Sequence, residues 1–284
     1  MLSILKNLVL LGNILNRIMI QEKFNEVPIF ILCGGMGTRM KEETEFKPKP
    51  MVNIGGTPIV FHIMKSYAAH GFRNFVLCLG FKSEFVKDFF LNRKYLANDF
   101  SVSSEQDGIK LLSSSKVEDW KIDLVDTGIN CMTGGRIARA YDKYYDNCSQ
   151  FGVTYGDGLC DLNIGKSFEF HKSGNSIGTI TGVNPVSRFG ELKTKGDSVT
   201  EFLEKPVIND QWINGGYFFF NSKFREYLST DHNCVLEQEP LKNLSKDNEL
   251  RIFKHSGFWR CMDTQRDKEE LEELYKNGEM DWLR

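Results

Sequence analysis

The chain has 284 residues, a formal net charge of −2 and 36 Lys+Arg that are spread along its length. It is long enough to bury a sizeable core, and its balanced charge excludes the basic footprint of a nucleic-acid-binding protein. Its seven cysteines contain no Cys-x-x-Cys pair and no histidine has metal-ligand spacing with them, which favours buried thiols in a reducing cytoplasm over disulfides or zinc.

Residues 1–26 form an N-terminal extension of different character from the rest. Its apolar run, residues 8–15, is too short to span a bilayer, and no signal cleavage site follows it. We expect a peripheral amphipathic helix or an overlong start with Met19 as the natural first residue. Residues 27–284 show no repeat or linker, which predicts a single continuous domain.

An apolar run at residues 29–32 stops abruptly at a glycine-rich stretch that ends in Thr38 and Arg39. Four consecutive apolar residues predict a strand buried on both faces. Glycines allow backbone N–H groups to form an anion-binding nest, and Arg39 adds a cation, so the ligand indicated is phosphate. A plain strand-to-helix turn is the alternative. A dinucleotide fingerprint is disfavoured because Met40 stands at the third glycine position, and no P-loop motif is present.

The prolines at 48 and 50 predict that Lys47 and Lys49 lie on an extended segment close to the nest, although a solvated linker is possible. Thr57 and Pro58 predict the N-cap and first position of a helix that ends near Gly71. A buried strand is expected at residues 75–79, followed by a helix capped by Ser83.

Residues 100–125 alternate in polarity, which predicts a solvated strand or hairpin. A second loop of glycines and hydroxyls at residues 132–136 precedes an expected helix to about Tyr145, whose N-terminus can face an anion or a base.

Residues 151–155 read as another buried strand, and Asp157 follows between two glycines. The carboxyl end of a strand is where ligands bind in an open α/β sheet, so Asp157 is a candidate metal ligand, with a turn residue as the alternative. A helix is expected around residues 168–172. Strands are then expected at 177–183, 199–203, 217–220 and 251–255. Asp263 precedes the last helix, where it is either a helix cap or a second metal ligand.

Two aspartates at strand ends, a glycine nest and isolated cations suit Mg²⁺-dependent chemistry on a nucleoside triphosphate. The run from Cys33 to Arg39 resembles the Gly-Gly-x-Gly-Thr-Arg signature of sugar nucleotidyltransferases, and the likeness continues from about Val27 to the end of the chain. Within that family the chain most resembles the glucose-1-phosphate cytidylyltransferases. The motifs that carry this likeness are residues 42–44, 47–52, 54–56, 126–136, 155–158, 237–241, 258–259 and 262–264.

The resemblance implies an α/β, Rossmann-like (GT-A-like) three-layer fold with a mixed, mainly parallel central sheet and a β-rich sugar-binding part. It implies a catalytic set of Arg39, Lys49, Asp157 and Lys205, and Mg²⁺ held by Asp157 and Asp263. The implied nucleotide-binding residues are Leu32, Cys33, Gly34, Gly35, Met36, Gly37, Thr38, Arg39, Lys49, Thr133, Arg136 and Gly156. The implied sugar-phosphate-binding residues are Gly190, Glu204, Lys205, Asn214 and Gly215.

The implied reaction joins CTP and α-D-glucose 1-phosphate into CDP-glucose and pyrophosphate. A relative that uses another nucleotide or hexose 1-phosphate, or a silent sugar-nucleotide-binding homologue, is the alternative. An NAD-dependent oxidoreductase is disfavoured by the missing third glycine. We expect a cytoplasmic homo-oligomer with no nucleic-acid partner and no membrane span.

Overall fold

The computed structural model describes residues 24–103, 108–113, 117–187, 189–204, 207–208 and 211–283. Most of the N-terminal extension (residues 1–23) and Lys205 lie outside these ranges. Phe24 is buried, and its ring stacks on that of Phe72 with the centroids 5.1 Å apart. The hydrophobic core therefore already includes residue 24. Within the described residues, no helix has both the length and the apolar composition of a membrane span.

A seven-stranded sheet in the order β14-β10-β13-β8-β1-β4-β7 forms the centre of the molecule. Only β13 runs antiparallel to its two neighbours; the other adjacent pairs in this sheet are parallel. The predicted mixed, mainly parallel sheet is therefore confirmed. The strands are β1 (Pro28–Leu32), β4 (Asn74–Leu79), β7 (Lys121–Asp126), β8 (Gln150–Tyr155), β10 (Gly178–Val183), β13 (Ile213–Asn221) and β14 (Leu250–His255).

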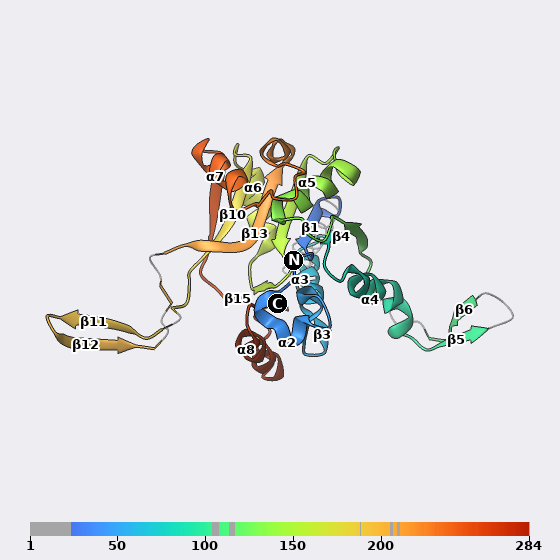
Figure 1. Cartoon of the computed structure of the whole chain (residues 1–284), viewed down its shortest axis with the longest axis horizontal. Coiled ribbons are helices and arrows are strands. Elements are labelled where there is room, and N and C mark those ends of the chain that lie inside the picture. Colours follow the sequence, from blue (N-terminus) through green and yellow to red (C-terminus); the bar gives the residue numbers. More distant parts are fainter. Residues whose placement is uncertain are drawn as a thin grey trace, which may run out of the picture.

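Helices cover both faces of this sheet, which gives the three layers expected from the sequence (Figure 1). Along β1, Ile29 and Ile31 pack into one core cluster and Phe30 into the other, which explains why the whole strand is apolar. The first face carries α3 (Ile59–Ala69), α4 (Ser83–Leu96), α6 (Ile164–Lys172) and α8 (Gln265–Lys276), and the second carries α5 (Thr133–Tyr144) and α7 (Glu239–Lys246). The shorter helices are α2 (Lys41–Thr44), η1 (Thr38–Met40), η2 (Lys49–Met51), η3 (Ser222–Tyr227) and η4 (Asp281–Leu283).

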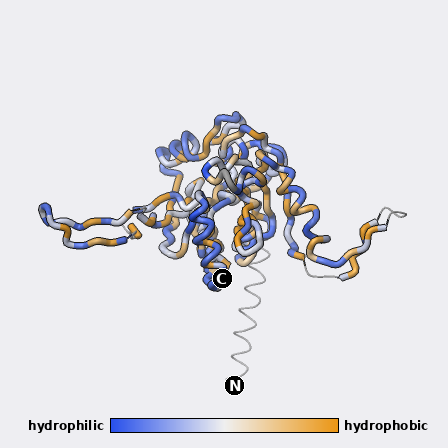
Figure 2. Tube along the Cα trace, turned by 60° about the horizontal axis from the view of Figure 1, so that its bottom comes forward, coloured by the Kyte–Doolittle hydropathy of each residue, from blue (hydrophilic) through white to orange (hydrophobic). Residues whose placement is uncertain are grey.

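Two hairpins project from the body as arms on opposite sides (Figure 1). One pairs β5 (Phe100–Ser103) with β6 (Gly108–Leu111), and the other pairs β11 (Glu191–Lys195) with β12 (Ser198–Leu203). Figure 2 shows apolar and polar residues mixed along both arms. The expected hairpin in residues 100–125 is confirmed for its first part, whereas residues 121–126 form the edge strand β7 of the central sheet.

A two-stranded ribbon links two distant parts of the chain beside the central sheet. It pairs β9 (Gly158–Cys160) with β15 (Trp259–Cys261), with Gly158 opposite Cys261 and Cys160 opposite Trp259. Asp157 immediately precedes β9, and Asp263 lies two residues after β15. The ribbon therefore brings together the two aspartates that the sequence singles out. A second short ribbon pairs β2 (Asn53–Ile54) with β3 (Thr57–Pro58).

Several helix starts differ from the sequence expectation. Thr57 and Pro58 belong to β3, and Pro58 is the residue before α3 rather than its first residue. Lys82, with φ 51°, is the left-handed residue before α4, so Ser83 is the first helical residue and not the cap. Helix α5 begins at Thr133, so Arg136 lies within its first turn rather than in a preceding loop.

The proline-rich segment also differs from the prediction of an extended chain. Lys49–Met51 forms the short 3₁₀ helix η2, and Pro48 precedes it with φ −68°. Proline excludes the interior of a helix but suits its start, because its fixed φ is already helical there. The prediction was wrong about the conformation of Lys49, although Pro48 and Pro50 do flank it.

Candidate active site

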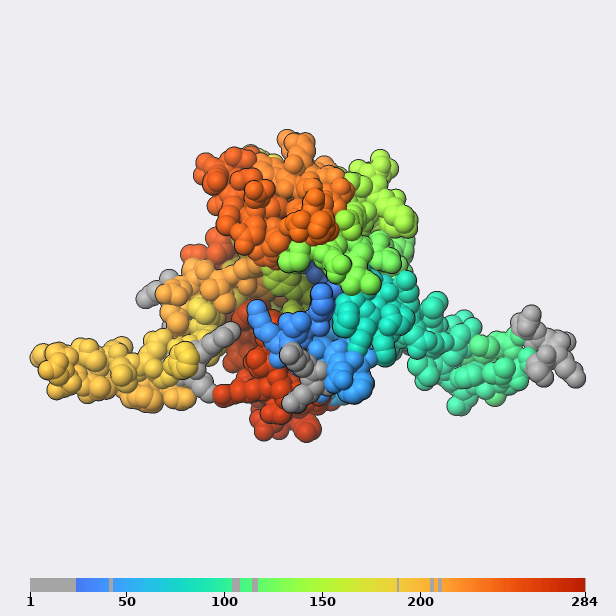
Figure 3. Space-filling model, in the orientation of Figure 1, coloured from blue at the N-terminus to red at the C-terminus, as the bar shows by residue number. Residues whose placement is uncertain are grey.

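The glycine-rich stretch and Asp157 meet at the carboxyl edge of the central sheet. They follow β1 and β8, which are parallel neighbours with Leu32 opposite Tyr155. A cavity of about 260 Å³ opens at this edge. Figure 3 shows the body hollowed at its centre, between an upper block coloured green and orange and a lower block coloured blue and red. The cavity is lined by Leu32, Gly35, Gly37, Thr38, Arg39, Lys49, Pro50, Gly156, Asp157 and Asp263.

Glycine is required by the local geometry at position 37. Its φ is +61°, and a Cβ atom there would lie 2.7 Å from the Thr44 methyl carbon and 3.2 Å from Lys49 Cβ. The Thr44 hydroxyl donates a hydrogen bond of 3.0 Å to the Gly37 carbonyl oxygen. This contact fixes the loop against α2 and holds its backbone close to Lys49.

Lys49 is the central cation of the site. Its ammonium donates to Asp157 Oδ2 at 2.6 Å and to Asp263 Oδ1 at 2.7 Å, and only 12% of its side chain is exposed. Burial disfavours the charged ammonium, but the Asp157 carboxylate and the hydrogen bonds to both aspartates outweigh it, so the pKa of Lys49 lies above its ordinary value. Lys49 therefore stays charged at neutral pH.

Arg39 extends this charged cluster toward solvent. Its guanidinium lies 3.1 Å from Asp263 Oδ2, and its side chain is 73% exposed. The site thus offers one largely covered and one exposed cation, a combination suited to holding a polyanion at the mouth of the cavity.

Asp157, Cys261 and Asp263 form a group whose possible metal-ligating atoms all lie within 4.8 Å of one another. Asp157 precedes β9 and Asp263 follows β15, so the two carboxylates flank paired strands of the ribbon, and both line the cavity. Asp263 is not the cap of α8, because Thr264 fills that position in a capping box with Asp267. A hard cation such as Mg²⁺ uses one or two carboxylates plus substrate oxygens, so the aspartate pair fits it.

Cys261 is a neighbour of this pair that the sequence did not single out. Burial, together with the carboxylates of Asp157 and Asp263, raises the pKa of its thiol well above the ordinary value. The thiol is therefore protonated at neutral pH and contributes no charge. Nothing in its sequence context signals this position, because the residue comes from the strand opposite Gly158.

Arg136 lies behind the cavity rather than in its lining. The residue is 4% exposed, and its guanidinium donates to the carbonyl oxygens of Gly34 (2.9 Å), Leu79 (2.9 Å) and Gly128 (2.8 Å). Leu79 is the last residue of β4, and Gly34 and Gly128 each lie two residues after the ends of β1 and β7. The geometry makes Arg136 a clamp on the loops at the carboxyl edge.

The cavity lining also leaves out four other predicted nucleotide residues, namely Cys33, Gly34, Met36 and Thr133. Cys33 and Gly34 are buried, whereas Met36 is 50% exposed. Burial raises the pKa of the Cys33 thiol, so it is a neutral core group. A Cβ atom at Gly34 would collide with the Arg136 guanidinium. Glycine is therefore needed at position 34 for Arg136 to pack against this loop.

A chain of hydrogen bonds links the start of α5 to the start of β13. Thr133 Oγ1 donates to Glu237 Oε2 at 2.8 Å, and the Tyr155 hydroxyl donates to Glu237 Oε1 at 2.6 Å. Asn214 Nδ2 in turn donates to the Tyr155 oxygen at 2.8 Å. Thr133 and Asn214 were predicted as site residues, but the residues that join them, Tyr155 and Glu237, were not.

The predicted sugar-phosphate residues are divided between two places. Asn214 and Gly215 lie near the start of β13 in the central sheet, where the Gly215 carbonyl accepts a hydrogen bond of 2.8 Å from Trp259 Nε1. Gly190 and Glu204 flank the arm formed by β11 and β12, and a Cβ at Gly190 would lie 3.3 Å from Glu204 Oε2. None of these four lines the cavity, and Lys205 falls outside the described residues.

A family model described as nucleotidyl transferase matches residues 29–260 of this chain. The chain is 42% identical over 252 residues to a glucose-1-phosphate cytidylyltransferase of Salmonella typhimurium, covering 89% of this chain and 97% of the relative. It is 40% identical to a probable glucose-1-phosphate cytidylyltransferase of Bacillus subtilis, with the same coverage.

Solved structures show the same fold at lower identity. A putative glucose-1-phosphate thymidylyltransferase from Bacillus anthracis matches with a TM-score of 0.63 and 14% identity, covering 88% of this chain and 96% of that one. This likeness confirms the predicted Rossmann-like architecture.

Proposed function

Because the chain belongs to the nucleotidyl transferase family, we propose that it is a glucose-1-phosphate cytidylyltransferase. It transfers the cytidylyl group of CTP to α-D-glucose 1-phosphate and releases pyrophosphate. The observation that carries this proposal is the likeness to curated glucose-1-phosphate cytidylyltransferases over most of both chains. The charged cavity at the carboxyl edge of the sheet supports it, because such an edge is where α/β folds bind nucleotides.

The reaction requires two polyanions to approach each other. A phosphomonoester has a second pKa near 6, so the attacking oxygen of glucose 1-phosphate is mostly anionic at neutral pH and needs no general base. The obstacle is the repulsion between the phosphates and the entropy of aligning them. Fixed cations in the cavity reduce the repulsion between the phosphates and hold them in line.

Lys49 and Arg39 are the proposed cations. Lys49 is held by Asp157 and Asp263, so little ordering of its side chain remains when a phosphate binds beside it. Arg39 lies further out and can follow the phosphates as they enter. The backbone of the glycine loop, with Thr38, would hold the triphosphate.

Mg²⁺ is the proposed cofactor, with Asp157 and Asp263 as its protein ligands. When bound, the ion supplies further charge neutralisation at the reacting phosphates. Lys49 would then exchange part of its contact with the aspartates for contact with the substrates.

Thr133 and Arg136 would act on the nucleotide in different ways. Thr133, at the start of α5, can contact it directly, whereas Arg136 holds the loops that surround it. Asn214, Gly215, Gly190, Glu204 and Lys205 are the proposed sugar-phosphate residues.

We also propose that residues 27–284 form one domain and that the protein is a cytoplasmic homo-oligomer.

The test is pyrophosphate release from purified protein with Mg²⁺, glucose 1-phosphate and each of CTP, UTP, dTTP and GTP in turn. We expect CTP to give the highest kcat/KM by at least about 100-fold, a discrimination that hydrogen-bonded recognition of the base can supply. If UTP, dTTP or GTP were turned over faster than CTP, the protein would be a transferase for that nucleotide and the proposal would be wrong. Mannose 1-phosphate and galactose 1-phosphate serve as matched controls for the sugar.

A further inference from the structure

The β9–β15 ribbon carries a second cluster of chemically reactive side chains at the end opposite the aspartates. Gly158 and Cys261 pair at the end near Asp157 and Asp263, whereas Cys160 and Trp259 pair at the other end. Cys160 and Asp161 stand where β9 ends, and His255 is the last residue of β14, just before β15. One group of possible metal ligands, Asp157 and Asp263, therefore lies at one end of the ribbon. A second group lies at its other end.

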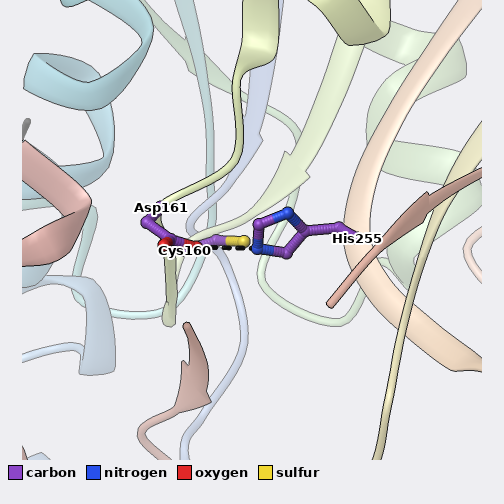
Figure 4. A group of neighbouring side chains, drawn as sticks. All are labelled: Cys160, Asp161 and His255. Atoms are coloured by element: carbon purple, nitrogen blue, oxygen red, sulfur yellow. Dashed lines mark ion pairs between the residues drawn. The ribbon is translucent and has the colours of Figure 1, made fainter. Parts of the chain in front are cut away.

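The second group consists of Cys160, Asp161 and His255, whose ligand atoms all lie within 4.8 Å of one another. His255 Nε2 is 2.7 Å from Asp161 Oδ1. Figure 4 shows the thiol of Cys160 and a ring nitrogen of His255 facing each other, with the Asp161 carboxylate beside them. Three different donor atoms thus converge from two strands.

The donor set has a definite chemical preference. Thiolate and imidazole are ligands that suit Zn²⁺ and similar transition metals, whereas Mg²⁺ is bound through oxygen. Ligand atoms in a tetrahedral zinc site are roughly 3.3–3.7 Å apart, given bonds of about 2.0–2.3 Å. The group is already close to this size, and entry of an ion requires a small separation of His255 from Asp161.

An ion can enter this group only from the side of Asp161, because Cys160 is 1% exposed. Asp161 is partly open to solvent, with 33% of its side chain exposed, while His255 is largely covered at 13%. Gly257 lies against the group, since a Cβ atom there would come within 2.5 Å of Asp161 Oδ1 and 2.7 Å of His255 Cε1. Any side chain at position 257 would therefore collide with the carboxylate and the imidazole.

We propose that Cys160, Asp161 and His255 bind a thiophilic divalent transition-metal ion of the Zn²⁺ type, separate from the Mg²⁺ site. The metal–sulfur bond forms as the Cys160 thiol releases its proton to solvent, and the Asp161 and His255 atoms complete three protein ligands. Such an ion joins the end of β9 to the end of β14. It therefore stiffens one end of the ribbon that carries Asp157 and Asp263 at its other end.

The first measurement is Zn²⁺ binding to the chelator-treated full-length protein in the presence of excess Mg²⁺, by competition with a coloured zinc indicator. We expect one tight Zn²⁺ equivalent per chain. Removing a direct ligand by Cys160→Ala or His255→Gln should weaken binding by roughly 100-fold or more, since even outer-shell changes cost 10- to 100-fold. Cys148→Ala, at a cysteine in the other core cluster, should leave binding unchanged.

Cobalt substitution identifies the thiol. Co²⁺ bound to a thiolate gives a charge-transfer absorption, which should disappear in Cys160→Ala and persist in Cys261→Ala. If the band instead persists in Cys160→Ala, or if the wild-type protein retains no Zn²⁺ above the Cys160→Ala level, the proposal is overturned and Asp161 and His255 are an ordinary ion pair. His255→Gln decides the question if Cys160→Ala fails to fold. Neither readout depends on cytidylyl transfer.

Discussion

Lys49 joins the two aspartates of the candidate site. It contacts Asp157 and Asp263 at once, and its Cβ would lie 3.2 Å from a Cβ atom placed at Gly37. The neighbouring Lys47 has a different environment, since its ammonium lies 3.8 Å from Glu43 and the residue does not line the cavity. Two lysines two positions apart therefore offer a direct comparison.

We predict that Lys49→Met lowers kcat by about 10²–10³, the usual effect of losing one preorganised electrostatic donor. The fold should survive, because the substituted side chain keeps an apolar stem of similar length. Lys47→Met is the control and should change kcat by less than about threefold, since a partly exposed ion pair with a separation of 3.8 Å contributes little. Steady-state kinetics with CTP and glucose 1-phosphate measure both, and equal small losses would contradict the role of Lys49.

Glu237 is a second residue whose importance comes from its contacts. Its carboxylate accepts hydrogen bonds from Thr133 and Tyr155, and burial and this carboxylate raise the pKa of Tyr155, which keeps its hydroxyl a donor. We predict that Glu237→Gln lowers kcat/KM by about 10- to 100-fold, because hydrogen bonds to a charged group contribute about 1.5–3 kcal/mol each. Glu239→Gln, at an exposed position two residues on, is the control. Similar kinetics of the two variants would show that the network does not support the site.

At the scale of elements, the sequence predicted the strands well. Residues 29–32, 75–79 and 151–155 are apolar on both faces because helices cover the sheet on both sides. The starts of helices were less predictable. The left-handed conformation of Lys82 and the 3₁₀ turn at Lys49 depend on tertiary contacts that no local pattern encodes.

The candidate site was predictable where function needs an unusual local sequence. The glycine loop and Asp157 carry such signals, and Asp263 was found with help from the family resemblance. Cys261, Tyr155 and the convergence of Cys160 with His255 were not predictable, because strand pairing and sheet order bring them together. Arg136 was expected near the nucleotide, and its burial behind the loops, where it donates to the Gly34 carbonyl, depends on tertiary packing that the sequence does not show.

Helix α6 is attached to the sheet through a buried histidine that makes stability depend on pH. His171 contacts Thr179 Oγ1 at 3.0 Å and Gln150 Oε1 at 2.9 Å, and burial, with a smaller effect of Arg251, lowers the pKa of His171 to about 4. In the unfolded chain a histidine has a pKa of about 6.5. Below that pH the unfolded state takes up a proton that the folded state does not, so stability falls as pH drops from about 6.5 to about 4.

We predict a loss of about 3 kcal/mol in unfolding free energy over this range from His171 alone. Urea denaturation at several pH values measures it. His171→Gln should remove this part of the slope, whereas His232→Gln, at an exposed histidine, should retain it. An unchanged slope in His171→Gln would mean that the buried imidazole is not the cause.

At the scale of the whole molecule, the two arms are the most unusual feature. An isolated two-stranded hairpin is marginally stable in water. Each arm carries an exposed pair of apolar residues facing each other across its strands: Leu192 with Phe202, and Val102 with Ile109. Such pairs are typical of surfaces that a second chain covers.

We predict that the protein forms a homo-oligomer through these arms. Light scattering after size-exclusion chromatography at micromolar concentration should give a multiple of the 32.6 kDa chain mass. The double variant Leu192→Ser/Phe202→Ser should reduce that mass. Lys193→Ser/Glu201→Ser, which removes the ion pair on the same hairpin, is the control. A monomeric wild-type protein would contradict the prediction.

The central claim is that this cavity transfers a cytidylyl group, and the fate of the α-phosphorus of CTP tests it most directly. CTP labelled at the α-phosphorus is incubated with Mg²⁺, glucose 1-phosphate and either the wild-type protein or Lys49→Met, and the products are separated. The account predicts that the label appears in CDP-glucose with the wild-type protein and is strongly reduced with the variant. Label found only in CMP or CDP, or equal CDP-glucose formation by both proteins, would contradict it.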